Sequence, residues 1–397
     1  MLSLCLAAGA ADLLTMEEAV RRALETHPEM AAARASRAVA AFQLQASRAW
    51  PVPEFRLTTN NLGADPETAE IRNSVAWRWS PPRPRELSFK ARIAEARRTT
   101  VEAEIRAAEA KVAGAVRYAY RRAALAAERE EVAARTVTLR AQMLEVVRRQ
   151  VATGLKERVE VDLAELARED ADAQRQRASA TAALEMRRLA RLIDPAGTIP
   201  FALAKVELGT GTGDREKWTE RAFQRRAELA QTAGDCEAAK AEAALARNGR
   251  YPWISFAQVT RRMGSGALER GPWGFQAGID LPLFRTAAQA EQRVATASAA
   301  KCQLELAALR DRVRREVEEA AMQLDAGVAE LLRLEALLQG PATRALVSLR
   351  AALEAGRADR LEVLQAEARQ LSLQERWLER RMEVAALESQ LEQATGL

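Results

Sequence analysis

The stretch GLKERVEVDLAE at residues 154–165 recurs as GRADRLEVLQAE at residues 356–367. Both copies begin with a glycine and keep an arginine, a glutamate and a valine in the same order, 202 residues apart. A match that preserves residue order over two distant segments indicates internal duplication. The 397-residue chain is therefore predicted to consist of two halves that repeat one structural plan.

Long stretches that contain almost no proline predict long helices in both halves. A helix of about 68 residues spans roughly 100 Å, which is longer than an ordinary globular domain. In each half two shorter helices together match the long one, so we expect them to stack end to end beside it and bury its apolar stripe. The first short helix should restart at Pro28. The predicted helices cover residues 15–49, 86–153, 157–193, 215–248, 286–355 and 357–394.

Alternating apolar and polar residues predict a β-hairpin in each half, at residues 54–80 and 253–284. Five of the seven tryptophans lie in or beside these two hairpins. A soluble hairpin packed on helices also has one apolar face. The aromatic residues at the strand ends favour a membrane β-barrel instead, in which outward side chains meet lipid and inward side chains meet water. Because an open strand edge is not tolerated in hydrocarbon, the strands of several chains would have to share one barrel.

The alternation assigns side chains to the two faces of these strands. The predicted lipid-facing aromatic residues are Trp77, Trp79, Trp273 and Phe275. The predicted lumen-facing residues are Arg72, Ser74, Arg78, Gln276 and Asp280.

The first ten residues, MLSLCLAAGA, are apolar and end in small residues of the kind at which secretory leaders are cut. We therefore expect a truncated signal peptide over residues 1–10. Lipidation at Cys5 is a less favoured alternative, because Leu4 is bulkier than lipoprotein processing normally accepts. Beyond residue 10, no apolar run approaches the roughly 20 residues of a membrane helix.

Residue types that carry catalysis or bind metals are scarce. The chain has one histidine, His27, and three cysteines far apart, so the sequence indicates neither a disulfide framework nor a zinc site. The glycine-rich stretch 208–214 lacks the lysine of a phosphate-binding loop. The net charge of +5 is spread over interleaved arginines and carboxylates, which is not typical of a nucleic-acid-binding surface. We expect no enzymatic activity, no cofactor, no bound metal and no nucleic acid.

In their order along the chain, several segments resemble the TolC family of bacterial outer-membrane channels. The resemblance rests on LTMEEAVRRALETHPEMAAARA near the start, on PVPEF leading into a strand, on LPLF, and on the repeated G-x-x-x-R-[VL]-E-V. It covers essentially the whole chain after the leader. It implies a mainly α-helical fold with a small β part. Duplicated antiparallel coiled-coil helices form a periplasmic α-barrel, and two hairpins per chain contribute four strands to the 12-stranded outer-membrane β-barrel of a homotrimer.

The resemblance also implies a division of the chain. Residues 11–194 would form the first TolC-like repeat, residues 195–214 a linker, and residues 215–397 the second repeat.

The function implied by the resemblance is that of a passive export duct in a tripartite efflux system. The duct would lie in the outer membrane, extend into the periplasm, and contact outer-membrane lipid. It would receive substrate from an inner-membrane pump, of the resistance-nodulation-division type, through a periplasmic adaptor, or membrane fusion protein. ASRAWPVPEFRLTTNNLG and Leu338–Pro341 resemble the heavy-metal-cation branch, although Val52 stands where that branch has asparagine. Drug or type I protein export by the same family is the alternative, and a soluble coiled-coil scaffold or adaptor is a rival from another class.

In the family, two helix turns form the periplasmic tip that contacts the adaptor, and these turns fall on Gly154 and Gly356. Glycine suits a turn of positive φ after a helix. The acidic constriction position of the family falls on Glu362, whereas a second acidic position falls on Gln365, a departure from the family pattern.

The tip region also has an explanation that needs no gate, since acidic residues in the first turn of a helix oppose its dipole. For Glu160 we prefer this explanation, and for Glu362 it is as good as a gating role. Arginines after each turn are expected to pair with carboxylates of neighbouring helices and hold the tip closed. The candidate gate residues are Glu160, Glu362, Gln365, Arg158 and Arg360.

Overall fold

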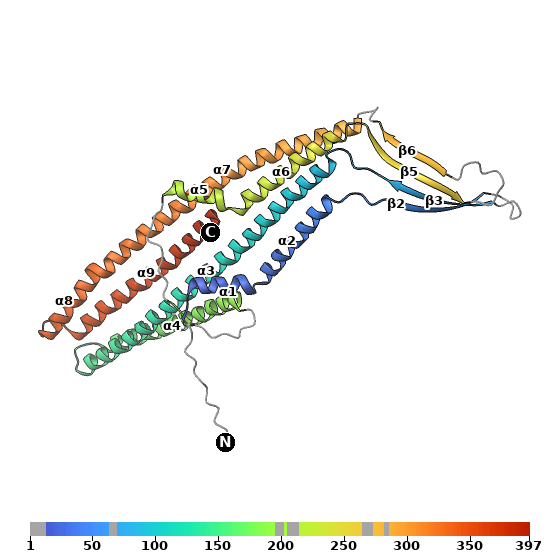
Figure 1. Ribbon diagram of the computed structural model, residues 1–397. Coiled ribbons are helices and arrows are strands. Elements are labelled where there is room, and N and C mark those ends of the chain that lie inside the picture. Colours follow the sequence, from blue (N-terminus) through green and yellow to red (C-terminus); the bar gives the residue numbers. More distant parts are fainter. Residues whose placement is uncertain (1–12, 63–69, 195–201, 205–213, 264–272, 282–285) are drawn as a thin grey trace, which may run out of the picture. The chain divides into compact units, whose positions relative to one another are not determined.

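The computed structural model describes residues 13–62, 70–194, 202–204, 214–263, 273–281 and 286–397 (Figure 1). The predicted signal peptide, Cys5 and most of the predicted linker lie outside these residues. The chain falls into two compact units, each built from separate segments. We call Met1–Ala32, Arg106–Arg226 and Asp311–Leu397 the helical unit, and Ala33–Ile105 with Ala227–Arg310 the sheet unit. These units cut across the predicted repeats 11–194 and 215–397, so that division stays a prediction.

The mainly helical fold predicted from the sequence is confirmed. The helices are α1 (Met16–Thr26), α2 (Pro28–Ser47), α3 (Glu86–Ala152), α4 (Arg158–Ile193), α5 (Arg215–Arg225), α6 (Ala227–Asn248), α7 (Thr286–Leu337), α8 (Thr343–Glu354) and α9 (Arg360–Thr395). As predicted, the first helix restarts at Pro28.

Two helices predicted to be continuous are interrupted. The stretch 215–248 breaks at Arg226, whose backbone is extended and whose guanidinium pairs with Glu316 of α7. The stretch 286–355 contains a wide turn, η1 (Leu338–Ala342), between α7 and α8. Pro341 in this turn has no N–H to donate, which disfavours a regular helix there. The Thr343 hydroxyl donates to the carbonyl oxygen of Leu338 at 2.7 Å, which satisfies a carbonyl group of the turn.

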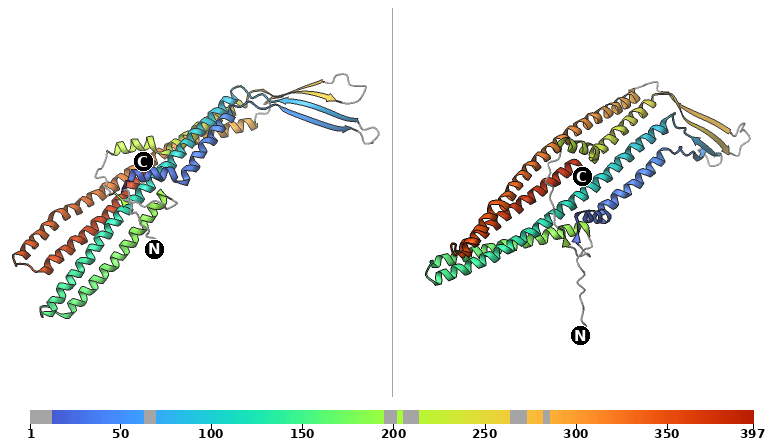
Figure 2. Two further views of the ribbon diagram at one scale, coloured as in Figure 1. Left: turned by 60° about the horizontal axis from the view of Figure 1, so that its bottom comes forward. Right: turned by 60° about the vertical axis from the view of Figure 1, so that its left-hand side comes forward.

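Four strands form one antiparallel sheet in the sheet unit (Figures 1 and 2). They are β2 (Glu54–Leu62), β3 (Glu70–Trp79), β5 (Trp253–Met263) and β6 (Trp273–Asp280), in the order β2-β3-β5-β6. Both predicted hairpins are therefore present, and β3 pairs with β5 to join them. The sequence analysis left this pairing between the hairpins open.

In the helical unit, α3 contacts both α4 and α9, and α9 contacts α7. Ion pairs mark each contact: Arg122 with Glu185 at 2.8 Å, Arg129 with Glu379 at 2.7 Å, and Arg380 with Glu330. Figure 2 shows the two helical hairpins of this unit, α3–α4 in green and α8–α9 in red and orange. The helices bury small and branched apolar side chains between them, including Leu125, Val132, Leu378 and Ala385.

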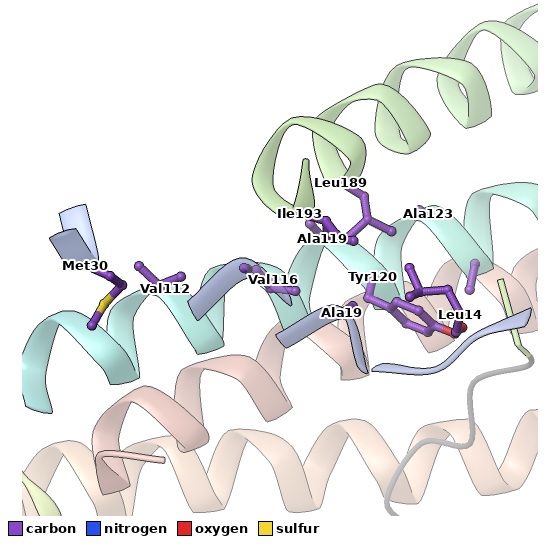
Figure 3. Packing of buried hydrophobic residues seen from close by; sticks show 12 residues of the cluster. Leu14, Ala19, Met30, Val112, Val116, Ala119, Tyr120, Ala123, Leu189 and Ile193 are labelled. Atoms are coloured by element: carbon purple, nitrogen blue, oxygen red, sulfur yellow. The ribbon is translucent and has the colours of Figure 1, made fainter. Parts of the chain in front are cut away.

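Among the described residues, Tyr120 of α3 is the largest fully buried side chain (Figure 3). It belongs to a buried cluster with residues of α1, α2, α3 and α4. Its hydroxyl donates to the carbonyl oxygen of Leu14 at 2.6 Å and accepts from the N–H of Ala204 at 3.0 Å. Leu14 belongs to β1 (Leu13–Leu14), which pairs in parallel with β4 (Ala202–Leu203). Burial raises the pKa of this hydroxyl. One side chain thus fixes two distant segments against α3.

We predict that Tyr120→Phe destabilises the protein by about 0.5–1.5 kcal/mol, because it keeps the ring and removes the hydrogen bonds of the hydroxyl, while the Ala204 N–H still donates to the Leu14 carbonyl at 3.3 Å. Unfolding in denaturant measures the difference. Tyr118→Phe is the matched control, since the Tyr118 hydroxyl contacts only the side chain of Arg122, at 3.3 Å, among the described residues. Equal stability of Tyr120→Phe and Tyr118→Phe would contradict the anchoring role.

A disulfide joins Cys236 of α6 to Cys302 of α7, with a Cα–Cα distance of 5.4 Å. The prediction of no disulfide was wrong, because it rested on the separation of the cysteines along the chain. Helices α6 and α7 carry Cys236 and Cys302 next to each other in space. On another side, α6 approaches α3 closely, since a Cβ at Gly234 would lie 2.5 Å from the Thr100 hydroxyl oxygen. The disulfide and this close helix contact thus both hold α6 within the sheet unit.

We expect Cys236→Ser with Cys302→Ser to lower the free energy of unfolding by about 2–4 kcal/mol, because the disulfide restricts the unfolded chain over a separation of 66 residues. Thermal unfolding in detergent, with and without reductant, provides the measurement. Cys5→Ser is the control that removes a cysteine and leaves the pair intact. A wild-type protein whose unfolding is insensitive to reductant would count against a formed disulfide.

Candidate functional site

The turns between α3 and α4 and between α8 and α9 lie at the two predicted glycines. Gly154 and Gly356 have positive φ angles, +73° and +70°. In each turn the residue after the glycine donates its N–H to a carbonyl of the last helical turn, from Leu155 to Gln150 and from Arg357 to Ala352, both at 2.8 Å. This bond pattern closes a helix end with a left-handed glycine. The duplicated sequence therefore builds the same turn twice.

A matching ion pair lies behind each turn. Arg148 contacts Glu165 at 2.6 Å, and Arg350 contacts Glu367 at 2.8 Å. The members of the two pairs occupy equivalent positions of the repeat, and each pair links the two helices of its hairpin. The hydrogen bond to Glu165 raises the pKa of Arg148. The sequence analysis missed these pairs, although the arginines recur 202 residues apart just upstream of the quoted repeat.

The candidate gate residues have local partners in the single chain. The backbone N–H of Asp359 donates to the Glu362 carboxylate at 3.1 Å, which forms a capping box at the start of α9. Glu160 pairs with Lys156 at 3.5 Å. Both glutamates therefore stabilise the start of a helix, and a gating role for them stays a prediction.

The other candidates are exposed around the two turns. Arg158, Arg360 and Gln365 lie at the surface, and no described carboxylate forms an ion pair with either arginine. A different contact connects the hairpins: the Gln150 side chain donates to the Asp359 carboxylate at 2.7 Å. Because Gln150 belongs to α3 and Asp359 precedes α9, this bond joins the two hairpins close to their turns.

The sheet separates the two predicted sets of side chains onto opposite faces. The register aligns Phe55, Trp77, Val259 and Phe275 in one row across the sheet. On this apolar face, Leu57, Phe275 and Phe55 are 79%, 75% and 74% exposed. Trp77, Trp79, Trp273 and Phe275, predicted to face lipid, all belong to the apolar face.

The opposite, polar face carries the residues that were predicted to line a lumen. The register aligns Glu54, Arg78, Gln258 and Gln276 in one row. Ser74 and Asp280 share this face by the alternation of their strands, and so does the backbone position of Arg72. The register therefore places the two sets on opposite faces of the sheet, while contact with lipid or with a lumen stays a prediction.

Arg83 joins the strands to the helices of the sheet unit. Its guanidinium donates to the carbonyls of Asn248 and Tyr251 at 3.4 Å and contacts Asp280 at 3.5 Å. The Trp253 indole N–H donates to the carbonyl of Pro81 at 2.9 Å in the same region. The sequence analysis missed Arg83, because no local pattern shows that a residue before α3 meets the end of α6.

A cavity of about 310 Å³ lies against α3, α4 and α9 in the helical unit. Arg122, Arg129 and Arg177 line it, and two of them are paired with Glu185 and Glu379. Glu375 also lines it, and burial raises the pKa of this carboxyl group. No described group of three or more histidine, cysteine, aspartate or glutamate side chains is placed to hold a metal ion. Among the described helices, none combines the length and apolarity needed to cross a membrane.

The fold is that of solved bacterial outer-membrane channels. CusC, described as forming a transmembrane channel, superposes with a TM-score of 0.77 at 18% identity over 98% of this chain and 95% of its own. The outer membrane protein VceC of Vibrio cholerae gives a TM-score of 0.74 at 19% identity over 96% of each chain. The open outer membrane channel MtrE of Neisseria gonorrhoeae gives 0.73 at 18% identity over 96% of this chain and 88% of its own.

Sequence comparison gives a match in the second half of the chain. Residues 218–397 match the family model described as outer membrane efflux protein. No curated protein sequence matches the chain. Residues 218–397 are therefore similar in sequence to outer membrane efflux proteins, and the described residues have the fold of solved outer-membrane channels.

We predict that Gly154→Ala and Gly356→Ala each lower the free energy of unfolding by about 1–2 kcal/mol, because a left-handed backbone brings Cβ close to the following carbonyl oxygen. Open space surrounds both positions, so only this backbone cost is measured. Gly114→Ala is the control: it lies within α3, also in open space, and should stabilise the protein by about 0.5–1 kcal/mol. Denaturant unfolding distinguishes these signs, and no loss at Gly154 would exclude the left-handed turn.

Proposed function

We propose that this chain is one subunit of a homotrimeric outer-membrane duct that exports substrates passively and has no enzymatic activity. The observation that carries the proposal is the four-stranded sheet, which has an exposed apolar face, a polar opposite face and two free edges. Large contiguous apolar surfaces on a protein mark contact with lipid or with another protein. An antiparallel sheet that meets lipid on one face and water on the other is typical of outer-membrane strands.

The free edges explain why several copies are needed. Among the described strands, none pairs with the outer edge of β2 or of β6. Unpaired backbone groups cost several kcal/mol each in hydrocarbon, so these edges require partners there. Pairing β6 of one copy with β2 of the next gives a heterologous contact, which closes into a ring. Three copies would then share a closed barrel of twelve strands, as the resemblance to TolC-like channels implies.

The helical hairpins supply the other part of the duct. We assign the turns at Gly154 and Gly356 to the periplasmic tip. There an adaptor would deliver substrate from an inner-membrane pump, for which the resistance-nodulation-division type is the first candidate. Glu362, Glu160, Gln365, Arg158 and Arg360 surround this entrance in the proposal. The hydrogen bond between Gln150 and Asp359 would have to break if the two hairpins separate during opening.

The disulfide supports placement of the protein outside the cytoplasm. Disulfides persist in oxidising compartments such as the bacterial periplasm and are rare in the cytosol. The pair between Cys236 and Cys302 therefore fits a chain that folds in the periplasm. Heavy-metal cations are one proposed cargo, and drugs or proteins are the alternatives within the same family.

The test uses two neighbouring residues of β6 that lie on opposite faces. We expect wild-type protein to be recovered from outer membranes as a heat-modifiable trimer and to conduct ions in planar bilayers. Phe275→Glu places a charge on the apolar face and should reduce membrane recovery, because a charged side chain at a lipid-facing position is destabilising, by about 2–4 kcal/mol for Arg or Lys at the bilayer midplane and by less for Glu. Gln276→Glu adds the same charge to the polar face and should leave trimer recovery unchanged.

Conductance is also recorded for the Gln150→Ala variant, which lacks the hydrogen bond between the two hairpins at the tip. If the wild-type entrance is closed, this variant should open more easily and conduct. A soluble wild-type monomer or dimer would overturn the proposal in favour of a coiled-coil scaffold. If trimers of both the wild-type protein and the Gln150→Ala variant show no conductance, the proposed duct is overturned. Equal sensitivity of Phe275→Glu and Gln276→Glu would overturn the assignment of the faces.

A further inference from the structure

An arginine on the polar face of the sheet is held against an aromatic ring. The guanidinium carbon of Arg78 lies 4.1 Å from the centroid of the Phe256 ring. A cation this close to a ring face is attracted by the quadrupole of the ring. The Arg78 side chain is half-buried, so its position is more restricted than that of a fully exposed arginine.

A break in strand alternation explains why Phe256 lies on the polar face. The register pairs Ile254 with Ile279 but pairs Phe256 with Gly278, so Ser255 is an extra residue in β5. Without this bulge, Phe256 would share the apolar face with Ile254. A β-bulge often re-aims a side chain near a functional site.

Gly278 leaves the space that the ring occupies. A Cβ at this position would lie 2.3 Å from Cε1 of Phe256 and 2.7 Å from the Ser255 hydroxyl oxygen. Any larger residue would therefore displace the ring. The bulge, the glycine and the ring together form a support for the Arg78 guanidinium.

The charge of Arg78 is not neutralised by the carboxylates of its own face. Glu54, opposite Arg78 in the register, pairs with Arg56 at 3.0 Å. Asp280 contacts Arg83 at 3.5 Å. Within the described residues, no carboxylate forms an ion pair with Arg78. A fixed positive charge therefore remains on the polar face, at the end of β3 nearest to α3.

We propose that three copies of Arg78, each held on Phe256 above Gly278, form a cationic ring in the duct that favours anions and binds carboxylate or phosphate groups of anionic cargo. This inference rests on the proposed function, because it needs the polar face to line a shared lumen. A ring of like charges in a narrow passage raises the local concentration of counter-ions. It argues against free heavy-metal cations as the preferred cargo.

The test measures the reversal potential of purified trimers in planar bilayers under a KCl gradient. We expect wild-type channels to favour chloride. Arg78→Gln should lower the chloride-to-potassium permeability ratio by about threefold, which corresponds to a fall of about half of kT per unit charge in the local potential. Gly278→Ala should lower the ratio in the same direction by displacing the ring, and Arg78→Lys should retain selectivity.

Arg261→Gln is the matched control, because Arg261 lies on the apolar face with its guanidinium 5.4 Å from the Trp273 ring centroid. It removes the same charge from the same sheet and should leave the ratio unchanged. Trimer formation on a gel confirms that each variant assembles. Channels that conduct with a ratio unaffected by Arg78→Gln would overturn the cationic ring and leave the duct intact. If neither wild-type protein nor the Gln150→Ala variant conducts, both the duct and the cationic ring are overturned.

Discussion

The pairing of backbone N–H and C=O groups at strand edges is the constraint on which the rest of this structure depends. The sheet β2-β3-β5-β6 satisfies its inner strands and leaves one edge of β2 and one of β6 open. Its apolar face is exposed in the single chain. In water such edges can be hydrated, whereas in hydrocarbon they need strand partners. The proposed trimer would supply these partners, and the proposed membrane contact would cover the apolar face.

The duplicated helices must bury their apolar stripes against one another. A helix such as α3, with 67 residues, must bury its apolar stripe, and within the helical unit α4 and α9 contact it. The two hairpins end in turns with the same glycine geometry and carry the same ion pair behind each turn. Exposed pairs of this kind are worth about 1 kcal/mol or less, so they set the register of two helices more than they hold them together.

Much of the candidate site was readable from local patterns. Alternation predicted one face for Trp77 and Phe275 and the other for Arg78 and Gln276, and the register aligns each pair in its own row, because side chains of a strand point to opposite sides in turn. The glycine turns were readable because a left-handed cap favours glycine. The contact between Arg78 and Phe256 could not be predicted from local patterns. A bulge shifts the alternation of β5, and the two residues lie on different strands.

By itself, the sequence determined the number and length of the helices to within a few breaks, the two hairpins, both turns and the polarity of each strand face. These features depend on residues close together in the chain. Only the tertiary structure decided the pairing of β3 with β5, the disulfide between Cys236 and Cys302, and the contacts of Arg83. Each of these joins residues far apart in the sequence, and their meeting depends on how whole helices and strands pack, which no local pattern records.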